Sequence, residues 1–200
     1  MKISLHWLKE YVALPDNITP DQIAYDLTMT TVEVQGHESQ AESLAHMVVG
    51  RIAELRQHPN ADRLRIVQTD VGKETKQIVC GGSNLVEGML VAVAPPGAKV
   101  RWHGEGELVE LKETKLRGEP SWGMICASDE IGLGEQFPAA AEKEIVDLSA
   151  FKVAPGTPLA DALELNDIII EIDNKSLTNR PDLWGHYGIA RELAAIYQVP

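Results

Sequence analysis

The sequence has little of what export, membrane insertion or redox chemistry requires. Only two of its 200 residues are cysteines, Cys80 and Cys126, and each lies in a short apolar run. Such a pair is typical of reduced, partly buried thiols in a cytoplasmic protein. No apolar run approaches the roughly 18 residues of a membrane span. The N-terminal MKISLHWLKEYV carries Lys9 and Glu10 where a signal peptide needs an uninterrupted apolar stretch. We therefore expect a cytoplasmic chain with no membrane partner.

Motifs for catalysis and metal binding are also lacking. The sequence contains no HExxH, no CxxC and no GxSxG, and its six histidines are scattered. The segment IVCGGSN, residues 78–84, lacks both the GxGxxG spacing and the GK[ST] ending of phosphate-binding loops. A strand followed by a glycine turn is the favoured interpretation. We predict no catalytic residue, no metal site and no cofactor in this region.

Charge is distributed unevenly along the chain. The formal net charge is −12, which disfavours nonspecific binding of nucleic acid. Residues 47–135 hold eleven basic and thirteen acidic residues, so −10 of the total falls on the flanks. Only the middle of the chain can present a basic face, and any RNA contact there should be weak in isolation and strongly dependent on salt.

The two flanks show mixed helix and strand patterns. A helix is predicted over residues 5–12 with Ser4 as N-cap, and a second begins at Pro20 after the cap Thr19. Residues 31–38 alternate like a strand. Near the C-terminus we expect a helix begun by Thr157 and Pro158, a strand at 168–172, and a helix with an apolar face. That face comprises Tyr187, Ala190, Leu193, Ala194 and Tyr197.

The middle of the chain is β-rich. Five strand-like segments are separated by Gly, Pro and Asn, which favours a small barrel or sandwich; they span residues 46–55, 63–71, 76–82, 89–100 and 107–116. A short helical turn should follow in SDEIGLGEQ. Since neither flank is long enough to build a core alone, we expect the flanks to pack together and the middle to be an insertion.

Two loops offer side chains to a nucleic acid. HPNAD, residues 58–62, is favoured as a tight turn, but it could also expose Asn60, Arg63 and Arg65 beside a groove. In residues 115–133, Lys115 and Arg117 alternate and should point the same way from a strand. They could meet phosphate or form a solvated face. Trp122 could stack on a base or cover the barrel mouth.

Together these pieces resemble a known family. The order and spacing of VVGRI, HPNADRL, IVCG, LRG, S-x-GM and EIG over about residues 40–150 are similar to the tRNA-binding OB domain. That domain occurs in methionyl-tRNA synthetase appendages, in free tRNA-binding proteins and in bacterial phenylalanyl-tRNA synthetase β chains. The flanks, MKISLHWLKEYV with TxxEVxG and residues 170–197, resemble the β chains. One departure from the family pattern is the segment that leads to LRG, residues 95–116, which is longer and more acidic than expected. It weakens the expectation of a basic surface and leaves the expected fold unchanged.

The resemblance implies an α+β fold, with a five-stranded OB-fold β-barrel at 40–150 inserted into a small discontinuous α/β domain at 1–39 and 151–200. The parent, a class II aminoacyl-tRNA synthetase, joins phenylalanine to tRNA with ATP and Mg²⁺ as an α2β2 tetramer. Its partners are the α subunit and tRNA. Its β subunit is several times longer, so we expect a truncated, non-catalytic piece.

The role expected for this region is architectural, with auxiliary tRNA binding. The candidate tRNA contacts are Asn60, Arg63, Lys115, Arg117 and Ser121. Two alternatives remain open: a stand-alone OB-fold tRNA-binding protein, and a scaffold domain that contacts only protein. In Asn179-Arg180-Pro181-Asp182, which forms a helix-entry turn, Arg180 is expected to pair with nearby acids.

Overall fold

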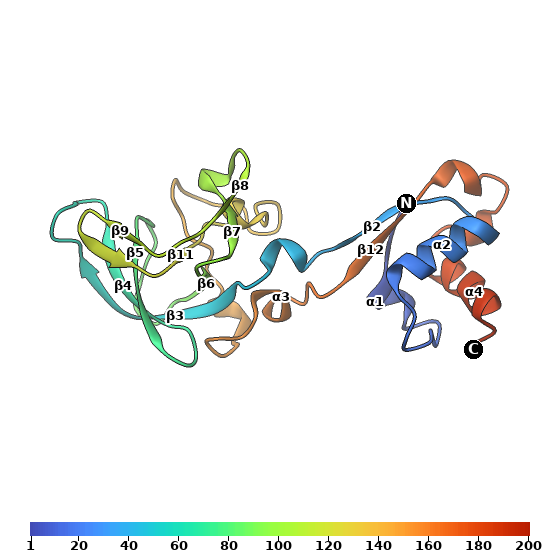
Figure 1. Cartoon of the computed structure of the whole chain (residues 1–200), viewed down its shortest axis with the longest axis horizontal. Helices are drawn as coiled ribbons and strands as arrows, with labels where there is room; N and C mark the ends of the chain where they lie inside the picture. The colour runs from blue at the N-terminus through green and yellow to red at the C-terminus, as the bar shows by residue number, and fades with distance from the viewer. The chain divides into compact units, whose positions relative to one another are not determined.

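The structure, a computed structural model, describes residues 1–200 and divides into two compact units. The flanking unit comprises Met1–Gln40 and Asn166–Pro200, and the barrel unit comprises Ala41–Leu165 (Figure 1). None of the helices combines the length and apolar character that a membrane span needs.

Both ends of the chain build the flanking unit. Its antiparallel sheet has the order β1-β12-β2, formed by Lys2–Ser4, Ile168–Ile172 and Val34–Ser39. Its helices are α1 (Leu5–Leu8), α2 (Pro20–Thr30) and α4 (His186–Tyr197), with short 3-10 turns at Asn174–Leu177 and Pro181–Leu183. They cover a buried apolar core made by Ile3, Leu8, Ile23, Leu27, Ile170, Ile189 and Leu193.

The helix starts predicted from capping residues are confirmed in this unit. The Ser4 and Thr19 side chains accept the backbone N–H groups of Trp7 and Gln22, which would otherwise lack partners in the first turn. The predicted end of the first helix at residue 12 is wrong. The chain leaves the helix after Leu8, whose carbonyl accepts N–H groups from both Tyr11 and Val12, and Val12 is nevertheless buried.

The apolar face predicted for α4 is partly wrong. Ala190 and Leu193 are buried as expected, but Tyr187 is 64% exposed and Ile189 takes the inner position. Arg180 pairs with two carboxylates, as expected. Its guanidinium contacts Asp182 at 2.9 Å and Glu192 at 3.2 Å, which ties the segment before α4 to the helix itself.

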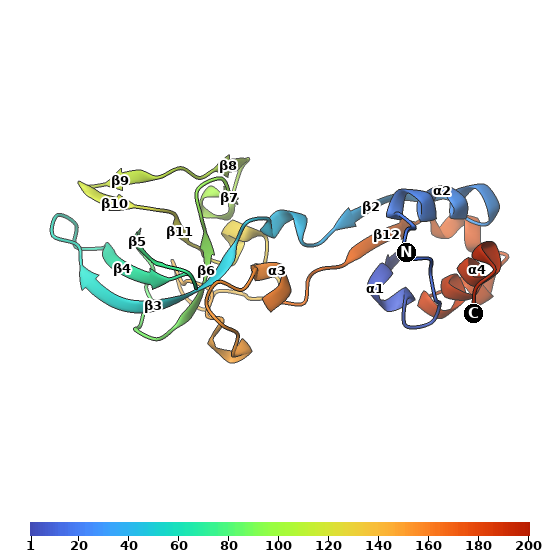
Figure 2. The ribbon, with the colours of Figure 1, turned by 60° about the horizontal axis from the view of Figure 1, so that its bottom comes forward.

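The barrel unit contains a five-stranded antiparallel half-barrel consistent with an OB fold, with the order β11-β6-β3-β4-β5 (Figures 1 and 2). The strands in that order are Met124–Ile125, Leu90–Ala94, Val48–Gln57, Arg65–Asp70 and Thr75–Cys80. β3 pairs with both β6 and β4, and its register shifts between Ile52 and Glu54. At Gly50 a Cβ would lie 2.5 Å from Val93, so only glycine fits this crossing.

The fifth strand differs from the prediction. We expected it over residues 107–116, but that segment splits between two hairpins outside the sheet. β7 (Lys99–Arg101) pairs with β8 (Leu108–Glu110), and β9 (Thr114–Leu116) pairs with β10 (Glu119–Ser121). The two-residue β11 takes the place beside β6 instead. Just before β11, the backbone N–H of Trp122 donates to the carbonyl of Gln77 in β5 at 2.9 Å. This bond brings together the two edges of the sheet, β11 and β5.

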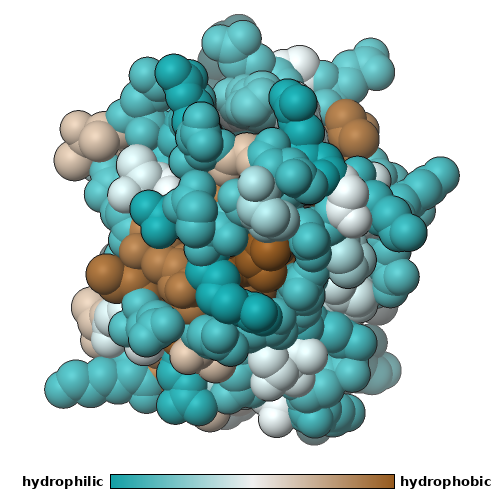
Figure 3. Space-filling model, turned by 90° about the vertical axis from the view of Figure 1, so that its left-hand side faces the viewer, coloured by the Kyte–Doolittle hydropathy of each residue, from teal (hydrophilic) through white to brown (hydrophobic).

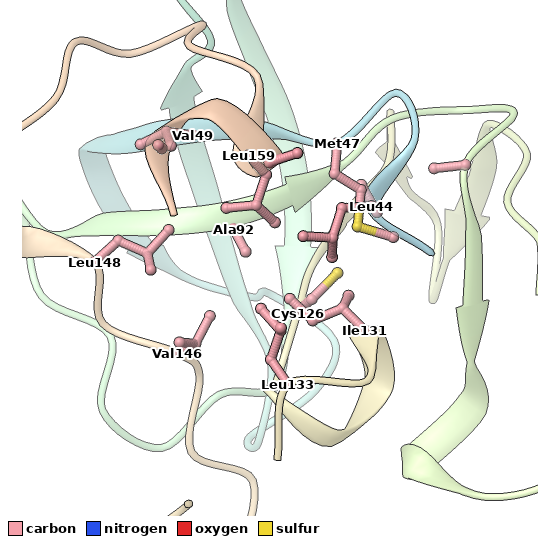
Figure 4. Close-up of a cluster of buried hydrophobic side chains, with 14 of the residues drawn as sticks. Leu44, Met47, Val49, Ala92, Cys126, Ile131, Leu133, Val146, Leu148 and Leu159 are labelled. Carbon is pink, nitrogen blue, oxygen red and sulfur yellow. The ribbon is translucent and has the colours of Figure 1, made fainter. Parts of the chain in front are cut away.

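One cluster of buried apolar residues explains which segments of the chain belong to the barrel unit. Val49, Ala92, Cys126, Leu148 and Leu159 pack together in it, drawn from widely separated segments (Figure 4). Leu159 lies in α3 (Leu159–Ala162), so residues 151–165, which we expected in the flanking domain, group with the barrel. Thr157 does not cap α3, because its hydroxyl donates to the Ala154 carbonyl and Pro158 is the N-cap. Short 3-10 turns complete the unit at Glu42–Leu44, Trp102–Gly104, Asp129–Ile131 and Ser149–Phe151.

Candidate nucleic-acid interface

A buried histidine organises the connection between β3 and β4. His58 is only 3% exposed, and its Nδ1 accepts the Asn60 N–H at 3.0 Å. The proton of a neutral ring must therefore sit on Nε2, which lies 3.1 Å from the Leu116 carbonyl and donates to it. The HPNAD turn predicted from the sequence is thus anchored to the end of β9 by one side chain.

The β9-β10 hairpin ends in a two-residue turn. Leu116 pairs with Glu119, which leaves Arg117 and Gly118 as the turn, with φ values of 53° and 100°. Positive φ at both positions is the geometry of a type I′ hairpin turn. The expectation that Lys115 and Arg117 point the same way from one strand is therefore wrong, because Arg117 lies in the turn and only Lys115 lies in the strand.

The two segments that carry the candidate residues contact each other. Besides the His58 bond, the Asn60 amide donates to the Arg117 carbonyl at 3.4 Å. Asn60, Arg63, Lys115 and Arg117 are all exposed. Ser121 is not: it is 2% exposed, and its hydroxyl accepts from Val79 N–H at 3.1 Å and donates to the Gly123 carbonyl at 3.0 Å. Ser121 therefore fastens β10 to β5 and does not offer its hydroxyl to solvent.

The cations at this end of the barrel make no ion pair. We use the name cationic end for Arg63, Arg65, Lys115 and Arg117, none of which takes part in a salt bridge. Elsewhere in the unit Arg51, Arg56 and Lys76 pair with carboxylates. Three acids, Asp62, Glu113 and Glu119, lie on the same two segments. The cationic end thus has a small local positive excess in an acidic chain.

A cleft adjoins the hairpin. Its volume is about 440 Å³, and its walls come from β5, from β9 with the residue before it, and from β10 with the residue after it. Those residues are Gln77, Glu113, Thr114, Lys115, Pro120, Ser121 and Trp122. The face of the barrel unit in Figure 3 is mostly hydrophilic around an apolar patch.

Sequence reasoning missed several residues of this site. His58 was interpreted only as part of a turn, and no local signal shows that its ring reaches Leu116. Gln77, Glu113 and Thr114 carried no motif, since they meet in the cleft only after the hairpin has folded onto β5. Two turn motifs are the only sequence signal for the contact between these segments: HPN at residues 58–60 and Arg117-Gly118 within LRG.

The two cysteines take no part in the site. Both are free and buried, as predicted. Burial raises the pKa of Cys80 to about 11 and raises the pKa of Cys126 well above its usual range. Since the thiolate is the reactive form, neither thiol is activated.

Comparisons with known proteins identify the family of the chain. Residues 47–150 match a family described as "Putative tRNA binding domain". The phenylalanine–tRNA ligase β subunit of Oceanobacillus iheyensis is 39% identical over all of this chain and 24% of its own length. That of Chlorobaculum tepidum is 43% identical over 97% of this chain and 23% of its own. A solved MetRS-related protein from Pyrococcus horikoshii is 20% identical, with a TM-score of 0.38, over 56% of this chain and 87% of that one.

The chain therefore spans about a quarter of the length of the curated relatives it matches. The resemblance drawn from the motifs is confirmed, both for the barrel and for the flanks. The chain belongs to the tRNA-binding domain family and is homologous along its whole length to the N-terminal region of phenylalanine–tRNA ligase β subunits.

Proposed function

We propose that the barrel unit binds tRNA through the cationic end. The observation that carries the proposal is the group of exposed, unpaired cations on two segments that His58 holds together. Arginine and lysine without carboxylate partners gain most from phosphate, because no existing ion pair must be broken. Asn60 adds a side-chain amide beside them, and Ser121 contributes by fixing the hairpin to β5.

The binding should be weak and auxiliary. Asp62, Glu113 and Glu119 offset most of the local charge, and the chain as a whole carries −12. Affinity that depends on a few phosphate interactions falls steeply as salt competes with them. This region therefore supports, rather than supplies, tRNA recognition by a larger protein.

The test is a titration of the 200-residue chain with tRNA at about 50 and 200 mM salt, a range over which salt weakens binding to phosphate. The variant Arg63→Ala/Lys115→Ala/Arg117→Asn should bind roughly tenfold more weakly at low salt. Its log–log salt slope should shrink by roughly 0.7–0.9 for each cation–phosphate interaction that the substitutions remove. Asparagine is chosen at Arg117 because it tolerates positive φ better than alanine does.

A matched control removes three exposed cations from the flanking unit: Lys9→Ala/Lys175→Ala/Arg191→Ala. It has the same net charge as the test variant, so equal weakening in both would mean that total charge, not the cationic end, governs binding. No measurable binding of the unaltered chain at low salt would overturn the proposal and favour a scaffold that contacts only protein.

The names of the relatives support a wider role for the full-length protein. We propose that it acts as the β subunit of phenylalanine–tRNA ligase in the cytoplasm, joining phenylalanine to tRNA with ATP and Mg²⁺ beside an α subunit. For this region we propose no catalytic residue. Purification of the full-length chain with and without a co-expressed α subunit, followed by an aminoacylation assay, tests the assignment.

An architectural role fits the flanking unit. Trp7, Tyr11, Trp184 and Tyr187 are 49%, 47%, 55% and 64% exposed, although large aromatic rings are usually covered. Exposed tryptophan and tyrosine are characteristic of protein contact surfaces. With these exposed aromatic rings, this unit is a better candidate for protein contact than for RNA contact.

A further inference from the structure

We propose that the cleft beside the β9-β10 hairpin holds one unpaired nucleotide, with its base stacked on Trp122. This inference rests on the proposed tRNA binding and specifies which part of an RNA the barrel unit takes. The cleft, of about 440 Å³, places Trp122, Thr114, Lys115 and Glu113 around one space.

Trp122 supplies an aromatic surface that the core uses only in part. The ring packs against the barrel core, yet the residue is half-buried and lines the cleft. Lys76 Nζ lies 5.1 Å from the ring centroid, where it holds the ring by a cation–π contact. The backbone N–H of Trp122 donates to the Gln77 carbonyl at 2.9 Å, so the main chain at this position is fixed as well. A ring held in place loses little entropy when a base stacks on it.

Some of the polar groups around the ring already have hydrogen-bond partners within the protein, and others have none. The Gln77 amide donates to the Pro120 carbonyl at 2.9 Å and accepts from Gln68 at 3.2 Å, so it is occupied. The Thr114 hydroxyl, the Lys115 ammonium and the Glu113 carboxylate take part in no hydrogen bond or ion pair. A donor, an acceptor and a cation are thus left for a ligand.

These groups match a nucleotide better than a bare phosphate. A carboxylate repels an anion but accepts hydrogen bonds from an exocyclic amino group or a ribose hydroxyl. Lys115 can meet the adjoining phosphate. The face of a base becomes available to a ring only where the base is not stacked in a helix, so a single-stranded or loop nucleotide fits and a duplex does not.

The experiment compares two RNA probes: an unstructured single-stranded 12-mer and the duplex it forms with its complement. The chain carries Trp122→Leu, which keeps apolar packing but removes the ring, or Trp122→Phe, which keeps a smaller ring. We expect Trp122→Leu to weaken binding of the single strand roughly tenfold and to leave duplex binding unchanged. Trp122→Phe should recover most of the affinity. Trp102→Leu, which alters an exposed tryptophan of the same unit outside the cleft, is the control.

Tryptophan fluorescence gives a second measurement. The single strand should quench the emission of the unaltered chain, and most of that quenching should vanish in Trp122→Phe. Unchanged quenching, or equal affinity of Trp122→Leu and Trp102→Leu for the single strand, would overturn the inference. If Trp122→Leu does not fold, the Phe variant decides through its quenching. Weakened binding in the cationic-end variant with no effect at Trp122 would remove the nucleotide site and leave the proposed function intact. Absence of binding to tRNA and to both probes would remove both.

Discussion

In the flanking unit Arg180 donates to Asp182 and Glu192, and Lys2 pairs with Glu38. In the barrel unit the four cations of the cationic end have no such partners. Arg180 holds the pKa of Asp182 below its usual range through a two-pronged hydrogen bond. The first arrangement uses charge to join segments of the fold, whereas the second leaves it free for a ligand.

This difference shows how a cation that stabilises the fold can be distinguished from one that is available to a ligand. A paired arginine such as Arg180 should matter for stability and not for RNA, whereas the unpaired cations grouped at the cationic end should matter for RNA and not for stability. His58 stands between the two classes, because it is a structural residue whose position sets where Arg63 and Arg117 lie.

The largest effect is expected for His58→Ala. The substitution leaves a cavity and removes the partners of Asn60 N–H and the Leu116 carbonyl, so the free energy of unfolding of the barrel unit should fall by about 2 kcal/mol. Binding of tRNA should weaken as well, because the loop and the hairpin are no longer joined. Urea denaturation and the tRNA titration measure the two effects. His6→Ala, at an exposed histidine, is the control, and an unchanged barrel transition would contradict the anchoring role.

A smaller effect, confined to stability, is expected for Arg180→Met. It removes the bonds to Asp182 and Glu192, so the melting temperature of the flanking unit should fall while tRNA affinity stays constant. Arg180→Lys should not restore stability, since an ammonium cannot make the same paired contacts. The cationic-end variant should show the reverse pattern. If Arg180→Met weakened tRNA binding as much as that variant does, the distinction between paired and unpaired cations would fail.

Elements whose signals are local could be predicted from the sequence. Thr19 followed by Pro20 starts α2 as expected, and the β-branched run at 168–172 forms β12, because capping and side-chain alternation depend on near neighbours. The β-rich pattern of the middle left a barrel or a sandwich open, and the OB fold was expected from the resemblance to the tRNA-binding domain family. The two-residue β11 could not be found, since so short a strand has no periodicity.

The candidate site was harder to predict because it depends on tertiary contacts. Asn60 and Arg117 are far apart in the sequence and meet through a backbone carbonyl, which leaves no trace in residue type. Ser121 was chosen as a surface contact, yet its hydroxyl faces Val79. Whether a polar residue near a turn serves the fold or a ligand is decided by its neighbours, and the sequence alone does not show them.

The smallest effect concerns pH and the flanking unit. His186 stacks on Trp7 with ring centroids 4.3 Å apart, and its Nε2 accepts the Ser4 N–H at 2.9 Å, which requires that nitrogen to be unprotonated. Burial lowers the pKa of His186 below its usual 6.5, although the nearby Asp167 carboxylate opposes the shift. As pH falls, the unfolded state takes up the proton before the folded state does.

The flanking unit should therefore keep its full stability above about pH 6.5 and lose part of it as pH falls through the lowered pKa. Thermal melts between pH 7.5 and pH 5 measure the decrease, with the barrel transition as an internal reference. His186→Gln does not titrate in this range and can still accept from Ser4, so its melting temperature should change less over the same interval. His6→Gln, at an exposed histidine, should behave like the unaltered chain. A His186→Gln protein with the same pH dependence as the unaltered chain would show that another group governs the acid sensitivity of this unit.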